Sequence, residues 1–83
     1  MVNMKDAVTN ANSFLADLFP EARNPRLEEV ELANDQFWNI VLSYEPWPAT
    51  PLGLLSGPNN RLFKLIRVDA DSGEPRSLKI WKM

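Results

Sequence analysis

Only one segment of this 83-residue chain carries the apolar spacing of a helix, and a proline ends it. Between residues 4 and 19 apolar side chains recur every third or fourth position, with polar residues between them. Asn3 is placed to cap the first turn, and Pro20 pushes the residue before it out of the helical region. The sequence therefore predicts a helix over residues 4–19.

The rest of the chain has the composition of strands, with β-branched and aromatic residues between polar ones. Strands are expected over residues 27–33, 37–45, 61–69 and 76–82. Residues 21–26 are expected to form a short turn, and Asn34-Asp35 and Asp69–Gly73 supply the residues of two hairpin turns. Sequential antiparallel pairing then gives a single α+β domain, with one N-terminal helix packed on a four-stranded antiparallel meander.

Residues 46–60 differ from the strands on either side of them. Four of the seven prolines and two of the three glycines lie in this segment, so a long Pro-rich loop is expected between the second and third strands. It is also apolar, with Trp47, Leu54 and Leu55. A loop of this length in a small domain is usually functional, and its apolar residues must pack on the domain or contact something else.

The alternation of side chains along the strands indicates two apolar sheet faces. One face suits the underside of the helix and carries residues such as Trp38, Ile40, Leu62, Ile66 and Ile80. The opposite face carries Leu27, Phe37, Val41, Phe63, Leu65 and Trp81. One helix cannot cover both faces, so either the 46–60 loop folds over the second face or another molecule does. A bulge in the third strand would exchange Phe63 and Leu65 with their neighbours.

The charge is small but unevenly distributed. The net charge is −2 and the pI about 5.0, which argues against a protein that binds double-stranded nucleic acid. Residues 1–60 hold three bases and eight acids, whereas residues 61–83 hold six bases and three acids. Cross-strand pairing of Glu28, Glu29 and Glu31 with bases on a neighbouring strand is the simplest interpretation. The alternative is a basic hairpin that binds single-stranded nucleic acid or a small ligand through Arg61, Lys64, Arg67 and Lys79.

The missing residue types argue against catalysis. The chain has no Cys and no His, which removes thiolate nucleophiles, the commonest general base and the commonest transition-metal ligands. Asp69-x-Asp71-x-Gly73 opens like a calcium loop, but Ile80 stands where the loop needs Glu. We therefore expect no enzyme activity, no cofactor and no metal. No signal peptide or membrane-spanning segment is recognised, so a cytoplasmic protein is expected.

The ending Leu65-Ile-Arg-Val-Asp-Ala-Asp-Ser-Gly-Glu-Pro-Arg-Ser-Leu78 resembles the final hairpin of PepSY-type modules. The helix with Ala7 and Ala11, ahead of an acidic strand, follows the same order, as in short bacterial proteins of this layout. PepSY-type domains are typically exported and linked to restraint of peptidases. The resemblance implies a small, non-catalytic module that binds another protein.

Together these observations predict a protein-binding module, acting as an inhibitor, antitoxin or immunity-like partner, or as a homodimer. The partner is another protein or a second copy of the chain, reached through the second sheet face and the 46–60 loop. The expected contact residues are Phe37, Val41, Trp47, Leu54, Leu55, Phe63, Leu65 and Trp81.

Overall fold

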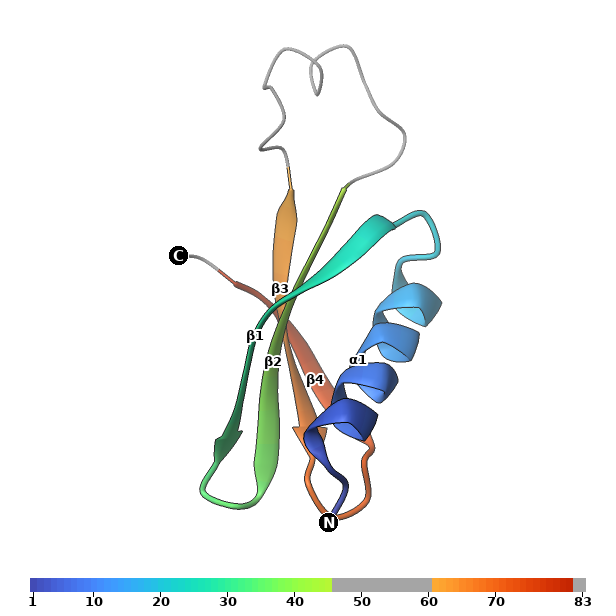
Figure 1. The fold of residues 1–83 in the computed structure, drawn as a ribbon. Helices are drawn as coiled ribbons and strands as arrows, with labels where there is room; N and C mark the ends of the chain where they lie inside the picture. The colour runs from blue at the N-terminus through green and yellow to red at the C-terminus, as the bar shows by residue number, and fades with distance from the viewer. Residues whose placement is uncertain (46–60, 82–83) are drawn as a thin grey trace, which may run out of the picture.

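The computed structural model describes residues 1–45 and 61–81, which form one helix and a four-stranded sheet (Figure 1). The elements are α1 (Met4–Leu18), β1 (Arg23–Ala33), β2 (Phe37–Glu45), β3 (Leu62–Asp69) and β4 (Pro75–Ile80). The strands lie in the order β1-β2-β3-β4 and every pair is antiparallel. The predicted α+β fold is confirmed. The predicted 46–60 loop, with Trp47, Leu54 and Leu55, lies outside the described residues.

Helix α1 begins and ends where its capping residues place it. The Asn3 side chain accepts a hydrogen bond from the backbone N–H of Asp6 at 2.8 Å, which satisfies one of the free donors of the first turn. The helix ends at Leu18, and the N–H of Phe19 donates to the carbonyl of Leu15 at 2.8 Å. At 15 residues α1 is too short and too polar to cross a membrane, and the described residues contain no longer helix.

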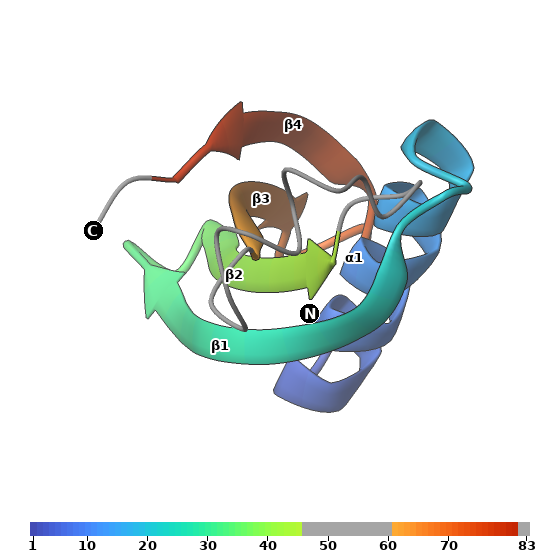
Figure 2. The same cartoon turned by 90° about the horizontal axis from the view of Figure 1, so that it is seen from above.

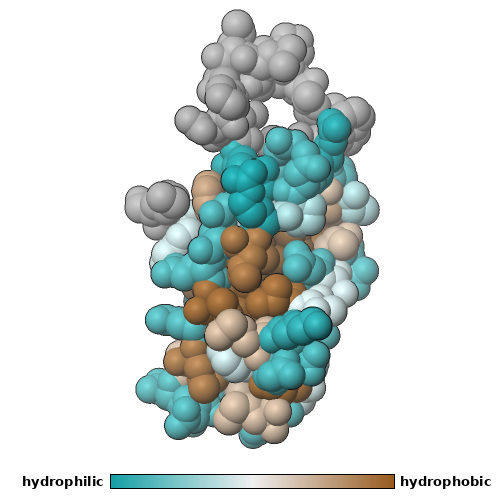
Figure 3. Space-filling view, viewed as in Figure 1, coloured by the Kyte–Doolittle hydropathy of each residue, from teal (hydrophilic) through white to brown (hydrophobic). Residues whose placement is uncertain are grey.

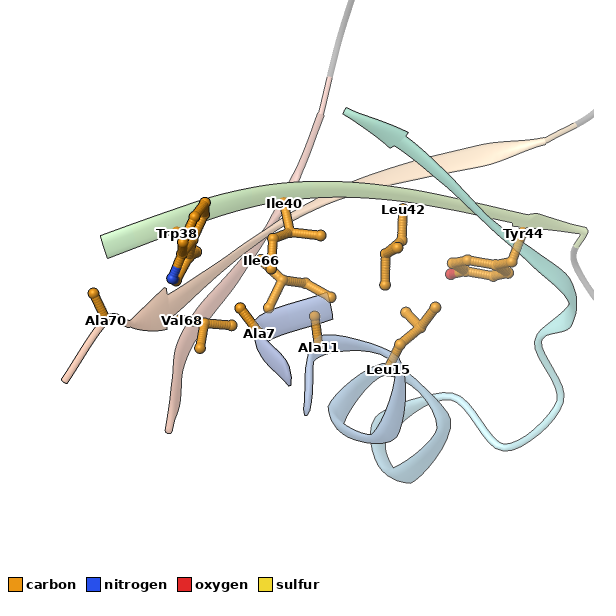
Figure 4. Close-up of a cluster of buried hydrophobic side chains, with 10 residues drawn as sticks. All are labelled: Ala7, Ala11, Leu15, Trp38, Ile40, Leu42, Tyr44, Ile66, Val68 and Ala70. Atoms are coloured by element: carbon orange, nitrogen blue, oxygen red, sulfur yellow. The ribbon is translucent and has the colours of Figure 1, made fainter. Parts of the chain in front are cut away.

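The core lies between α1 and one face of the sheet (Figure 4). Its buried members come from the helix and from alternate positions of the two central strands: Ala7, Ala11, Leu15, Trp38, Ile40, Leu42, Tyr44, Ile66, Val68 and Ala70. This is the face predicted to lie under the helix. Two residues predicted there, Leu62 and Ile80, are instead 42% and 70% exposed. Figure 1 shows the reason for Ile80, because the end of β4 runs away from α1.

Strand β1 begins at Arg23, so the predicted turn over residues 21–26 is wrong. The strand can contain Pro25 because β1 is an edge strand, where one side of the backbone has no neighbouring strand to accept an N–H. The pairing with β2 is also irregular between Arg23 and Arg26. A second irregularity between Leu27 and Glu29 adds one residue to β1. Leu27 therefore pairs with Leu42 on the helix side, and its expected place on the opposite face is wrong.

The register of β2 and β3 is unbroken from Phe37–Asp69 to Tyr44–Leu62. No bulge exchanges the side chains of β3, so Phe63 and Leu65 lie on the face away from α1. Strand β4 runs over Pro75–Ile80 rather than the predicted 76–82. The N–H of Trp81 still donates to the carbonyl of Phe63 at 3.0 Å, which places Trp81 beside Phe63.

The β3–β4 turn packs against the helix and requires a glycine. Gly73 has a φ of +78°, and a Cβ there would lie 3.0 Å from both Asn10 Nδ2 and Val2 Cγ1. Asn10 Nδ2 donates to the carbonyl of Gly73 at 2.8 Å. Within the turn the N–H groups of Ser72 and Asp71 donate to the Asp69 carboxylate, which lowers the pKa of Asp69. These contacts hold the hairpin against α1.

Tyr44 gives a pH-dependent signal that reports on this core. The ring is 3% exposed and stacks on Phe19 with 5.8 Å between centroids. Burial, and then the nearby Glu21 carboxylate, raise the pKa of Tyr44 above its usual 10.0. The phenol's contribution to stability is therefore complete below pH 10 and is lost as pH rises through the raised pKa.

Because Tyr44 is the only tyrosine, the ultraviolet absorbance of its phenolate follows this ionisation directly. We expect a titration midpoint above 10.0 in the native protein and about 10 in concentrated urea. Tyr44→Phe is the control, since it removes the signal and the alkaline loss of stability that accompanies it. Equal midpoints in the two solvents would show that folding does not perturb the phenol.

Candidate functional site

The sheet face turned away from α1, called the far face from here on, is the candidate site. Figure 2 shows α1 on one side of the sheet, and no described element lies over the other. The strand register places Glu29, Val41, Leu65 and Lys79 side by side across β1, β2, β3 and β4. This row has an acid at one edge, a base at the other and two apolar residues between them.

The next row along the far face is polar throughout and again has an acid on β1. Glu31, Asn39, Arg67 and Ser77 lie in register across the four strands. The Arg67 guanidinium donates to Asn39 Oδ1 at 3.2 Å and lies 5.1 Å from the centroid of the Phe37 ring. The acidic side chains therefore follow β1 and the basic ones follow β3 and β4.

A hollow of about 70 Å³ opens in the middle of the far face. It is lined by residues of β1, β2 and β3 and by the residue that follows β4: Glu29, Glu31, Asn39, Val41, Leu65 and Trp81. Val41 is 3% exposed and forms the floor, while Leu65 and Trp81 are half-buried. The two carboxylates stand on the β1 side only. The hollow therefore suits a binding partner that places an apolar group against Val41 and a cation beside Glu29 and Glu31.

Five of the predicted contact residues come together on the far face, and none of them is fully exposed. Val41 is buried, and Phe37, Phe63, Leu65 and Trp81 are half-buried. Phe63 pairs with Ser43 on β2 and with Trp81 on the other side. Because these side chains are buried or half-buried, only part of this apolar surface is available to a partner.

More exposed apolar residues lie on the helix side, where sequence reasoning did not place an interaction surface. Leu27, Leu62 and Ile80 are 45%, 42% and 70% exposed. Figure 3 shows apolar side chains reaching the surface across the middle of the molecule. The exposure of Leu27 depends on the β1 bulge, for which the sequence contains no clear signal.

A polar cluster of Asn24, Glu28, Ser43, Glu45 and Arg61, called the Arg61 cluster, occupies one end of the sheet. The Arg61 side chain is 10% exposed and donates to Ser43 Oγ at 3.0 Å and to the Asn24 carbonyl at 2.5 Å. Ser43 Oγ donates to Glu28 at 2.5 Å. Glu45 accepts from the Asn24 amide at 2.7 Å and lies 3.8 Å from Arg61 Nη1. These contacts join β1, β2 and the residue before β3.

The four bases of the predicted nucleic-acid surface do not share one surface. Arg61 donates within its cluster, and Lys64 lies on the helix side with its Nζ 5.4 Å from the Phe19 ring centroid. Only Arg67 and Lys79 are exposed on the far face. The structure therefore separates the bases that the sequence grouped.

The acids of β1 do not pair directly with bases on the neighbouring strand, as the sequence suggested. Strand β2 is the only neighbour of β1 and carries no Lys or Arg. Glu28 instead accepts the Ser43 hydroxyl, and Glu29 and Glu31 line the hollow. Across residues 1–45 and 61–81, no group of three or more acidic side chains is arranged to hold a metal ion.

No protein-family model, curated protein or solved structure matches this chain. The resemblance to PepSY-type modules therefore rests on the residues of the last hairpin and on the order of elements.

Proposed function

We propose that this chain is a small, non-enzymatic protein-binding module and that the far face is its binding surface. The observation that carries the proposal is the row Glu29, Val41, Leu65 and Lys79, which places an apolar centre between opposite charges. Binding surfaces commonly combine an apolar centre with a polar rim. Helix α1 packs on the other side of the sheet, and within residues 1–45 and 61–81 no element lies over this row, whose two ends are exposed while Leu65 is half-buried and Val41 buried.

The size of the hollow favours a protein partner over a small-molecule ligand. At about 70 Å³ it is several times smaller than ordinary ligand pockets, which start at about 300 Å³, and its walls are mostly strand residues on an open face. One side chain of a partner fills such a space. The half-buried Leu65 and Trp81 supply the apolar contact, and the charges at the two edges set the orientation of the partner.

A module of this kind acts by covering a surface of its partner. That mode agrees with the inhibitor, antitoxin or immunity-like role expected from the sequence, and with the restraint of peptidases that the PepSY resemblance implies. It requires no cofactor and no titrating catalytic group.

Affinity capture with matched variants tests the proposal. The baits are the tagged wild type, Leu65→Glu on the far face and Ile80→Glu on the helix side, each first shown to fold by circular dichroism. Both substitutions replace an aliphatic side chain with a carboxylate, and Ile80 is 70% exposed. We expect the wild type and Ile80→Glu to retain the same proteins, including untagged copies of the chain, and Leu65→Glu to lose them. If Leu65→Glu retains everything that the wild type retains, the far face is not the binding surface.

A further inference from the structure

We infer that the partner on the far face is a second copy of this chain, packed face to face about a two-fold axis parallel to β2 and β3. The inference rests on the proposed function, because it names the occupant of that same surface. It is carried by the order of charges across the sheet.

A two-fold axis parallel to the strands turns one sheet over and exchanges its edges. Strand β1 of one copy then lies over β4 of the other. The row Glu29, Val41, Leu65, Lys79 meets the same row in reverse. Glu29 faces Lys79 of the second copy, Val41 faces Leu65, and both contacts occur twice. A row with acid and base at opposite ends is therefore complementary to itself.

The second row is compatible with the same axis. Glu31 faces Ser77 of the second copy, and Asn39 faces Arg67. No like charges meet in either row. An axis perpendicular to the strands would instead place β1 over β1, so that Glu29 and Glu31 would face carboxylates. The charges thus favour one of the two face-to-face arrangements.

The charges of the first row cannot pair with each other inside one copy. Glu29 and Lys79 lie three strand spacings apart, about 14 Å across the sheet. Both side chains are exposed, and no ion pair joins either of them to another side chain within residues 1–45 and 61–81. A second copy would bring each within reach of an opposite charge at the usual spacing of packed sheets, about 10 Å.

The hollow gives the second copy an apolar contact as well. Its floor is Val41, which the axis places opposite Leu65 of the other copy. The two leucines enter the two hollows symmetrically. The contact surface, four strands wide and about five residues long, measures about 19 Å by 17 Å. An interface of this size is small, so the dimer is expected to be reversible and to depend on concentration.

Sedimentation equilibrium of charge-swap variants tests the inference at low ionic strength. We expect a monomer–dimer equilibrium for the wild type and about a tenfold weaker dimer for either Glu29→Lys or Lys79→Glu, because each places like charges in two contacts. An equimolar mixture of these two variants should form a heterodimer of about wild-type affinity, as both contacts then join opposite charges. The double variant should also recover dimerisation. Lys5→Glu makes the same charge change as Lys79→Glu on an exposed helix residue and should leave the equilibrium unchanged.

The outcomes separate this inference from the proposed function. A wild type that stays monomeric at millimolar concentration, or single variants that dimerise like the wild type, would overturn the second copy as the occupant. If the monomeric chain captures a different protein that Leu65→Glu loses, the far face remains a binding surface. A dimer that persists unchanged in Leu65→Glu would overturn the second copy as the occupant, and it would overturn the far face as well if this variant also retained every captured protein.

Discussion

Leu42→Ala should lower the free energy of unfolding by about 3 kcal/mol. Leu42 is 0% exposed and lies in the middle of β2, where the sheet meets α1 (Figure 4). Truncation removes a buried methine and two buried methyl groups and leaves a cavity that the surrounding strands, held by their register, fill only partly. In a domain of this size that loss is a large fraction of the total stability.

Urea denaturation followed by tryptophan fluorescence measures the effect. Leu62→Ala is the matched control, because the same atoms are removed from a side chain that is 42% exposed. We expect it to cost less than about 1 kcal/mol, since little apolar surface returns to water there. Similar losses in the two variants would mean that α1 does not pack on β2 as described.

Arg61→Ala should lower the free energy of unfolding by about 2 kcal/mol. The Arg61 side chain is 10% exposed and donates to two carbonyl groups, those of Asn24 and Ser43, and to the Ser43 hydroxyl. Its removal leaves acceptors at the end of the sheet without their donor. The ion pair with Glu45 contributes little to this figure, because Glu45 is 46% exposed and its charge is screened.

Thermal and urea unfolding of Arg61→Ala and Arg67→Ala together measure this difference. Arg67 is exposed and makes one hydrogen bond to Asn39, at 3.2 Å, so its truncation should cost less than about 1 kcal/mol. Arg61→Lys should recover only part of the loss, because an ammonium group cannot reproduce the planar fork of donors. Equal stability of Arg61→Ala and Arg67→Ala would show that the Arg61 cluster does not form in solution.

Much of the fold could be predicted because local patterns and tertiary packing agree. The apolar spacing of residues 4–19 is confirmed by α1, whose buried residues are Ala7, Ala11 and Leu15. The alternation in β2 is confirmed by the burial of Trp38, Ile40, Leu42 and Tyr44. Gly73 takes the positive φ expected of the last turn. In the helix and the strand one period fits one arrangement of side chains, and at Gly73 the positive φ disfavours residues with a Cβ.

The start of β1 could not be predicted, because Asn24-Pro25 is typical of a turn. The structure accepts Pro25 in a strand only because β1 is at the edge of the sheet, and a strand's position in the sheet is a tertiary property. The same holds for the bulge between Leu27 and Glu29. One extra residue reverses which face each earlier side chain occupies, so simple alternation along β1 predicts the wrong face for Leu27.

The sequence by itself determined the order of elements, the helix, and the face of each central strand that packs under it, because these follow from periods of 3.6 and 2 residues. Only the tertiary structure decided which charges meet. Register brought Glu29, Val41, Leu65 and Lys79 into one row, and packing at the end of the sheet directed the Arg61 side chain toward Ser43. The physical reason is that strand pairing joins residues distant along the chain, and a bulge or a long connection shifts the register that alternation alone would give.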